Sequence, residues 1–160
     1  MSNQKKSVII VDDHNLFRNG LKFILEEIEG LEVVAEASNG QEFIDIIDNF
    51  IPDLVLMDIN MPVMNGVEAS RLALDKHPNL KILVLSMFGD EEYYNTMIDI
   101  GVKGFILKDA DNQELKMAIE KIIHDGNYFS QELLIKLIKN KPGDTKITLT
   151  RREQEILEYM

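Results

Sequence analysis

Five polar residues follow short apolar runs of the sequence and could together carry out metal or phosphoryl chemistry. They are the adjacent aspartates Asp12 and Asp13, a third aspartate, Asp58, the hydroxyl of Ser86 and the ammonium of Lys108. Two carboxylates about 4 Å apart repel each other by about 4 kcal/mol at an effective dielectric constant of about 20. Three of them therefore require raised pKa values or a cation. Mg²⁺ suits such a site because it binds one or two carboxylates, keeps several waters and takes phosphate oxygen as a further ligand.

Each of these residues, taken alone, also has a simpler interpretation. Asp12, Asp13 or Ser86 could cap the helix that follows it, because short polar side chains satisfy the free N–H groups there. Asp58 precedes Asn-Met-Pro and could be an ordinary turn residue. Lys108 could be a solvated charge. Whether the five residues meet depends on the elements that position them.

Five short apolar runs alternate with amphipathic segments along the chain. The runs are residues 8–11, 31–37, 54–57, 82–85 and 102–107, and the segments are residues 16–29, 40–50, 66–77, 90–100 and 111–125. This alternation predicts an α/β fold, a flavodoxin-like doubly wound sheet of five parallel strands with helices on both faces. The second run carries Glu32 and Glu36 among its apolar residues and suits an edge strand, which agrees with the strand order 2-1-3-4-5.

The predicted topology brings the polar residues to one place. In open α/β sheets, ligands bind beyond the carboxyl ends of the strands where the strand order reverses, which is here between the first and third strands. The first strand is followed by Asp12 and Asp13, and the third by Asp58. The next two strands add Ser86 and Lys108. The convergence of four strand ends favours a shared metal and phosphoryl site over five independent structural roles.

Composition limits the other classes of function. A chain of 160 residues with 45% hydrophobic residues and no cysteine can bury a core, and any metal must be held by oxygen or imidazole. Residues 1–130 carry 11 Lys and Arg against 23 Asp and Glu, so this part should repel nucleic acid, whereas residues 131–160 carry six against five. No apolar stretch approaches the roughly 20 residues of a membrane span and no signal peptide is visible. We expect a cytoplasmic protein with no membrane partner.

Four motifs in order resemble the receiver domain of bacterial two-component response regulators. They are VDDH at 11–14, LMDINMPVMNG at 56–66, LSM at 85–87 and GFILK at 104–108, within a resemblance that covers residues 7–125. The stretch LFRNGLKFILEEIEGLEVVAEASNGQE is similar to the opening of the NarL/FixJ subfamily, whose members couple a receiver to a LuxR-type helix-turn-helix. The resemblance implies a response regulator of a two-component system, partnered by a sensor histidine kinase.

The resemblance also implies the metal ligands. Asp13, Asp58 and the backbone carbonyl of Asn60 would bind Mg²⁺ directly, and Asp12 would contribute through a water molecule. Such a chain would be a phosphoacceptor switch that promotes only its own phosphorylation and dephosphorylation, and we expect no other enzymatic activity.

The remaining roles concern the phosphoryl group. Asp58 would be the nucleophile that accepts it, Lys108 would pair with it, and the Ser86 hydroxyl would bind one of its oxygens. Phe105 matches the aromatic position whose rotamer follows Ser86, and we expect its ring to turn in after phosphorylation. Phosphorylation is expected to favour a homodimer, through α-helices one and five or through helix four and strand five.

The C-terminal part is expected to contain a helical extension. We predict a receiver at residues 1–126, a short helix and linker at 127–147, and the incomplete start of a LuxR-type DNA-binding domain at 148–160. Thr150 and Glu153 form a capping box for the last helix. A terminal amphipathic helix is the alternative. Promoter DNA would be a partner of the complete protein, not of this chain, because no recognition helix is included.

Two other functional classes remain to be compared. A magnesium-dependent phosphohydrolase of the haloacid-dehalogenase type would need a D-x-D motif after the first strand, whereas these aspartates are adjacent. A nucleotide or flavin module of similar fold would need a glycine-rich phosphate loop, and neither G-x-x-x-x-G-K nor G-x-G-x-x-G occurs. His14, His77 and His124 have no ligand spacing, and we assign them surface or packing roles.

Overall fold

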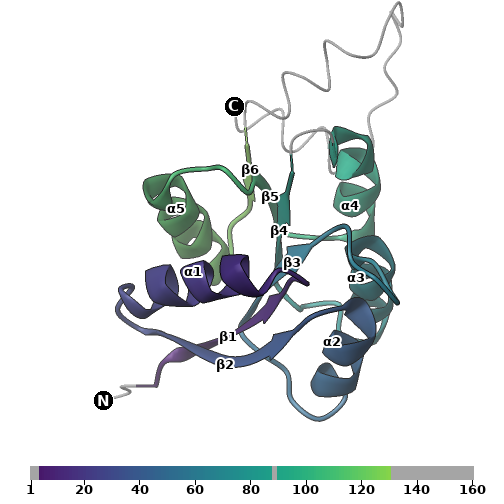
Figure 1. Ribbon diagram of the computed structural model, residues 1–160, viewed down its shortest axis with the longest axis horizontal. Helices are drawn as coiled ribbons and strands as arrows, with labels where there is room; N and C mark the ends of the chain where they lie inside the picture. The colour runs from purple at the N-terminus through teal and green to yellow at the C-terminus, as the bar shows by residue number, and fades with distance from the viewer. Residues whose placement is uncertain (1–3, 88–89, 131–160) are drawn as a thin grey trace, which may run out of the picture.

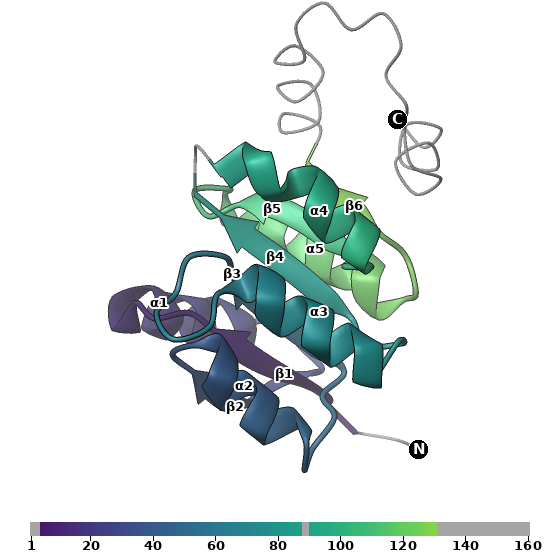
Figure 2. The same ribbon diagram turned by 90° about the vertical axis from the view of Figure 1, so that its right-hand side faces the viewer.

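A six-stranded parallel sheet with helices on both faces forms the part of the chain that the computed structural model describes, residues 4–87 and 90–130 (Figures 1 and 2). The strands are β1 Lys6–Val11, β2 Leu31–Ala37, β3 Leu54–Asp58, β4 Ile82–Ser86, β5 Gly104–Leu107 and β6 Tyr128–Phe129. The helices are α1 Asn15–Glu26, α2 Gly40–Ile47, α3 Gly66–Lys76, α4 Tyr94–Ile100 and α5 Asn112–Ile123, with a 3₁₀ turn, η1, at Asp90–Tyr93. The sheet order β2-β1-β3-β4-β5-β6 confirms the predicted order and adds one strand.

The core lies in two layers, one on each face of the sheet. Side chains of β1 alternate between them: Ile9 and Val11 pack toward α2, α3 and α4, whereas Val8 and Ile10 pack toward α1 and α5. Figure 1 shows α1 and α5 together on one side of the sheet, and Figure 2 shows α2, α3 and α4 together on the other. The wholly apolar runs that form β3 and β4 are therefore central strands buried on both faces, which agrees with the predicted strand order.

The sixth strand corrects the prediction of five. Tyr128 and Phe129 pair with Gly104 and Phe105 of β5, and the Ser130 N–H donates to the Phe105 carbonyl at 3.0 Å. A Cβ on Gly104 would lie 2.8 Å from the Tyr128 carbonyl oxygen, so glycine permits this close pairing. A two-residue strand has no hydrophobic period, which is why the sequence pattern did not indicate it. The sheet thus continues past residue 126.

Helix boundaries were predicted too widely. The first helix ends at Glu26 instead of residue 29, and the predicted segment 90–100 begins as a 3₁₀ turn before α4. Three helices are capped by a side-chain oxygen on the residue before them, Asn39, Asn65 and Asp111, which accepts the N–H three residues later. These caps fix where the chain turns from the loop into the helix.

No helix within the described ranges is both long and apolar enough to cross a membrane. The predicted short helix after Ser130, the linker and the start of a DNA-binding domain lie outside the described residues, apart from the residues that form β6.

Candidate functional site

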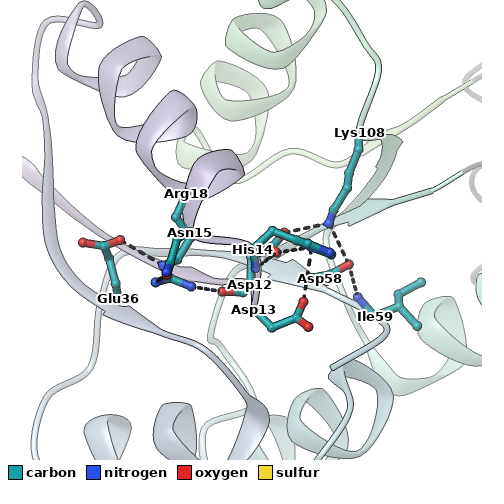
Figure 3. A network of polar contacts seen from close by, with 9 residues as sticks. All are labelled: Asp12, Asp13, His14, Asn15, Arg18, Glu36, Asp58, Ile59 and Lys108. Carbon is teal, nitrogen blue, oxygen red and sulfur yellow. Dashed lines mark hydrogen bonds and ion pairs between the residues drawn. The ribbon is translucent and has the colours of Figure 1, made fainter. Parts of the chain in front are cut away.

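The carboxyl edge of the sheet brings together the polar residues predicted for the site. Asp12 and Asp13 follow β1, Asp58 ends β3, Ser86 ends β4 and Lys108 follows β5. Figure 3 shows the Lys108 side chain reaching toward the carboxylates of Asp12 and Asp58, with Asp13 beside them. Three strand ends that are far apart in sequence, those of β1, β3 and β5, therefore form one acidic pocket, and Ser86 ends β4 on the same edge of the sheet.

Lys108 forms an ion pair with both buried carboxylates. Its Nζ lies 2.7 Å from Asp12 Oδ2 and 3.2 Å from Asp58 Oδ1. The Lys108 side chain is 11% exposed, and those of Asp12 and Asp58 are 2% and 3% exposed. Charges taken out of water this completely require such partners. The alternative in which Lys108 is a solvated charge is therefore wrong.

The carboxyl group of Asp58 has a strongly perturbed protonation equilibrium. Burial, followed by the negative charge of Asp12, raises its pKa from 3.8 to about 6. The ammonium of Lys108 and the Ile59 N–H, which donates to Asp58 Oδ1 at 2.8 Å, act in the opposite direction but do not offset the burial. The folded chain thus holds Asp58 in an environment that disfavours its negative charge and favours an added cation.

Asp12, Asp13 and His14 form a tight turn before α1. Asp12 Oδ1 accepts the His14 backbone N–H at 2.8 Å and lies 3.1 Å from His14 Nδ1, while Asp13 Oδ1 lies 3.3 Å from the same nitrogen. The N-cap of α1 is His14 itself, and its side chain makes no capping hydrogen bond. The aspartates therefore do not cap α1 directly.

One ligand atom from each of Asp12, Asp13, His14 and Asp58 lies within 4.8 Å of the others. Sequence reasoning assigned His14 a surface or packing role. Its side chain is 59% exposed, yet its Nδ1 belongs to this cluster. The sequence gave no signal for this role, because no second ligand stands at a regular spacing from His14. Its neighbours in the cluster are the two preceding residues and Asp58 of another strand.

Two residues of α1, Phe17 and Arg18, contact the site and were not singled out from the sequence. The Arg18 guanidinium donates to the Asp12 carbonyl oxygen and to Asn15 Oδ1, and its Nε donates to Glu36 Oε1 at 3.1 Å (Figure 3). The Phe17 ring lies beneath Lys108, with Nζ 4.6 Å from the ring centroid. These contacts of Phe17 and Arg18 thus hold the first turn of α1 against the pocket.

The loop from β3 to α3 approaches Asp58 closely because Gly66 has no side chain. A Cβ on Gly66 would lie 1.9 Å from the Asp58 carbonyl oxygen. The Gly66 N–H donates to the Ile59 carbonyl at 2.7 Å, and Val63 in the same loop adopts a left-handed conformation with φ of 68°. Gly66 therefore determines how near the start of α3 can come to the pocket.

Ser86, at the end of β4, and Phe105, in β5, lie in the interior of the fold. Ser86 is fully buried, and its Oγ is 3.5 Å from the Ile106 carbonyl oxygen, a long separation for a hydroxyl hydrogen bond. It does not cap α4, whose N-cap is Tyr93. The Phe105 ring is also fully buried and packs against Tyr94 at 5.1 Å between centroids. The ring is thus buried in this structure, and its change of rotamer after phosphorylation stays a prediction.

Comparisons with known proteins identify the family. Residues 8–120 match the response regulator receiver domain. The chain is 34% identical over 180 residues to the transcriptional regulatory protein DegU of Brevibacillus brevis, covering 100% of this chain and 76% of that protein. It is 37% identical over 161 residues to the oxygen regulatory protein NreC of Staphylococcus aureus (strain JH9), covering 94% of this chain and 74% of that protein.

Solved structures agree with this assignment. A LuxR-family two-component response regulator from Aurantimonas sp. SI85-9A1 superposes with a TM-score of 0.80 at 28% identity, covering 86% of this chain and 99% of that one. A DNA-binding response regulator of the LuxR family from Staphylococcus aureus gives a TM-score of 0.69 at 28% identity, covering 74% and 98%. The chain therefore belongs to the response regulator receiver family, among the LuxR/NarL-type transcriptional regulators of two-component systems.

Proposed function

We propose that this response regulator is switched by phosphorylation of Asp58, with a phosphohistidine of a sensor histidine kinase as the donor. The observation that carries the proposal is the buried Asp58 carboxylate at the end of β3, paired with Lys108 at 3.2 Å and flanked by the acidic residues after β1. An ionised carboxylate at a topological switch point is placed to act as a nucleophile toward a phosphoryl group.

The chemical step transfers the phosphoryl group between two nucleophiles. An Asp58 carboxylate oxygen attacks phosphorus, an O–P bond forms and the N–P bond of the phosphohistidine breaks. The electron pair of that bond stays on the imidazole nitrogen, which takes a proton from solvent. Lys108 supplies positive charge beside the oxygens of the transferred group. Because the pKa of Asp58 is about 6, its carboxylate form predominates at neutral pH and is available for attack.

We further propose that Mg²⁺ binds at Asp13, Asp58 and the Asn60 backbone carbonyl, with Asp12 contributing through water. The donor set fits, because one oxygen from each of three carboxylates lies within 4.8 Å of the others, and the buried Oδ1 of Asp13 accepts no hydrogen bond within the described ranges, its contact being an ion pair with His14 Nδ1 at 3.3 Å. When bound, Mg²⁺ supplies positive charge that neutralises the carboxylates and the phosphoryl oxygens. The residues of the chain hold the nucleophile in place and keep bulk water away from it.

Ser86 and Phe105 are proposed to report the phosphoryl group to the surface. The Ser86 hydroxyl is held only at 3.5 Å by a carbonyl on β5, so a phosphoryl oxygen would compete well for its proton. Movement of Ser86 would change the packing of Phe105 against Tyr94 of α4. The surface made by α4 and β5 is therefore the expected place of the conformational response.

The mass of the intact protein tests the phosphorylation of Asp58. After incubation with acetyl phosphate or phosphoramidate and Mg²⁺, we expect one phosphoryl adduct in the parent chain and none in Asp58→Asn. Omitting Mg²⁺ or adding a chelator should suppress the adduct. An adduct of undiminished yield in Asp58→Asn would contradict the assignment.

A homodimer and promoter DNA are the proposed partners of the phosphorylated, complete protein. The relatives are transcriptional regulators, and the Staphylococcus aureus structure is named a DNA-binding response regulator. Light scattering with and without beryllofluoride, a phosphoryl analogue, should show a mass increase in residues 1–160. An unchanged mass over a wide concentration range would contradict dimerisation.

Residues 148–160 are proposed to begin a LuxR-type DNA-binding domain, and residues 1–160 are expected not to bind promoter DNA selectively, because selective readout needs a positioned recognition helix. Fluorescence anisotropy at physiological salt is the appropriate measurement. Tight, sequence-selective binding by residues 1–160 would overturn the domain assignment.

A further inference from the structure

The ammonium of Lys108 has a third contact besides its two carboxylates. Its Nζ lies over the face of the Phe17 ring, 4.6 Å from the centroid. The face of an aromatic ring carries partial negative charge and attracts a cation within about 6 Å. Lys108 is 11% exposed, so the ring takes the place of water on one side of the charge. The ammonium is thus enclosed by Asp12, Asp58 and Phe17.

The position of Phe17 is fixed by the start of α1. Phe17 lies in the first turn of this helix, and the neighbouring Arg18 guanidinium donates to the Asp12 carbonyl oxygen at the end of β1. The Phe17 side chain is half-buried and packs against the core layer beneath α1 and α5. The ring is therefore a fixed surface, whereas the four-carbon stem of Lys108 is flexible and has many rotamers.

We propose that Phe17 is a positioning residue that holds the Lys108 ammonium in the pocket for the phosphoryl group. The inference rests on the proposed function of Asp58. When the Asp58 carboxylate becomes an acyl phosphate, negative charge moves outward onto the phosphoryl oxygens, and the ammonium has to follow it. The Phe17 ring keeps the charge close to this position and lowers the entropy that Lys108 loses when it pairs with the phosphoryl group.

This role predicts that loss of the ring weakens the binding of one ligand of the pocket and does not weaken the binding of the other. Without the ring, Lys108 is less well placed, so a phosphoryl analogue should bind more weakly. Mg²⁺ should bind equally well or slightly more tightly, because Lys108 competes with it for the carboxylates of Asp12 and Asp58. A general loosening of the pocket would instead weaken both ligands together.

Beryllofluoride and Mg²⁺ are the probes for the experiment, which uses the whole chain of residues 1–160. We compare the parent, Phe17→Leu, which keeps apolar volume but removes the ring, and Phe17→Tyr, which restores a ring. Phe23→Leu is the matched control, because Phe23 lies on the same helix and is 67% exposed. Phenylalanine analogues with one, two or three ring fluorines, inserted only at position 17, withdraw electron density from the ring face with little change of shape.

In Phe17→Leu we expect beryllofluoride affinity at saturating Mg²⁺ to fall by about threefold to thirtyfold, the range that a partly desolvated cation–π contact allows. Phe17→Tyr and Phe23→Leu should retain the affinity of the parent, and each added fluorine should lower it further. Mg²⁺ affinity, measured alone by calorimetry, should not fall in Phe17→Leu.

Several results would overturn the proposal. Equal beryllofluoride affinity in Phe17→Leu and the parent would do so, as would proportional losses for beryllofluoride and Mg²⁺ or no trend across the fluorinated series. If the parent bound beryllofluoride but took no phosphoryl group at Asp58, the proposed function would fail by itself. If the parent did neither, the inference would fail with it.

Discussion

Replacing Asp58 by asparagine should stabilise the protein, although it removes the proposed phosphorylation site. In the folded chain, burial and the charge of Asp12 raise the pKa of Asp58 from 3.8 to about 6. Between these two values the folded state binds more protons than the unfolded state, so stability falls as pH rises through the window. The favourable contribution of the protonated Asp58 side chain to the free energy of unfolding is fully present below pH 3.8 and is lost above a pH of about 6.

The magnitude follows from the two pKa values. Each pH unit in the window is worth about 1.4 kcal/mol, so the ionised Asp58 carboxylate costs the folded state about 3 kcal/mol above the upper value. Asparagine does not ionise, and its side-chain oxygen can still accept the Ile59 N–H that now donates to Asp58 Oδ1 at 2.8 Å. Lys108 keeps its ion pair with Asp12 at 2.7 Å, so no buried charge is left without a partner.

The expected advantage of Asp58→Asn over the parent therefore grows from well below ~1 kcal/mol near pH 4 to about 3 kcal/mol near pH 8. Urea unfolding followed by circular dichroism, in a chelator and at several pH values, measures this difference. Asp75→Asn on the exposed side of α3 is the control and should change little at any pH. Adding Mg²⁺ should stabilise the parent and reduce the difference in unfolding free energy between Asp58→Asn and the parent. A difference that does not change with pH, or that becomes smaller as pH rises, would refute the electrostatic reasoning.

Three further substitutions test the pocket. Asp13→Asn should weaken Mg²⁺ binding about tenfold or more in a calorimetric titration, because it removes ligand charge, and equal affinity in both chains would rule out direct ligation. Lys108→Ala should leave Mg²⁺ bound at least as tightly but abolish the dimerisation that follows phosphorylation, and retained dimerisation in light scattering would contradict its role. Gly66→Ala should lower the free energy of unfolding by about 1–3 kcal/mol, because its Cβ would lie 1.9 Å from the Asp58 carbonyl oxygen. Its control, Gly20→Ala, adds a methyl group to open space in α1 and should stabilise by about 0.5–1 kcal/mol in the same urea experiment.

The sequence alone determined the alternation of strands and helices, the strand order and the residues that follow the strands. These features were accessible because hydrophobic periodicity is a local property, and because parallel strands joined by right-handed crossovers place their carboxyl ends on one edge of the sheet. Knowing that Asp58 and Lys108 each lie at the carboxyl end of a strand was therefore enough to predict that they share a pocket. The resemblance to receiver domains came from four motifs in order, VDDH, LMDINMPVMNG, LSM and GFILK, which include these strand ends.

Only the tertiary structure decided how these groups pair and what surrounds them. Side-chain packing decides which carboxylate lies nearer to Lys108. In the structure it is that of Asp12, at 2.7 Å. The raised pKa of Asp58 arises chiefly from its burial in the fold. The contact of Phe17 with Lys108 joins α1 to the residue that follows β5, across about 90 residues of sequence. The strand β6 likewise forms because Gly104 lets Tyr128 approach β5. Interactions of this kind join residues far apart in sequence, so no local pattern of residue types could specify them.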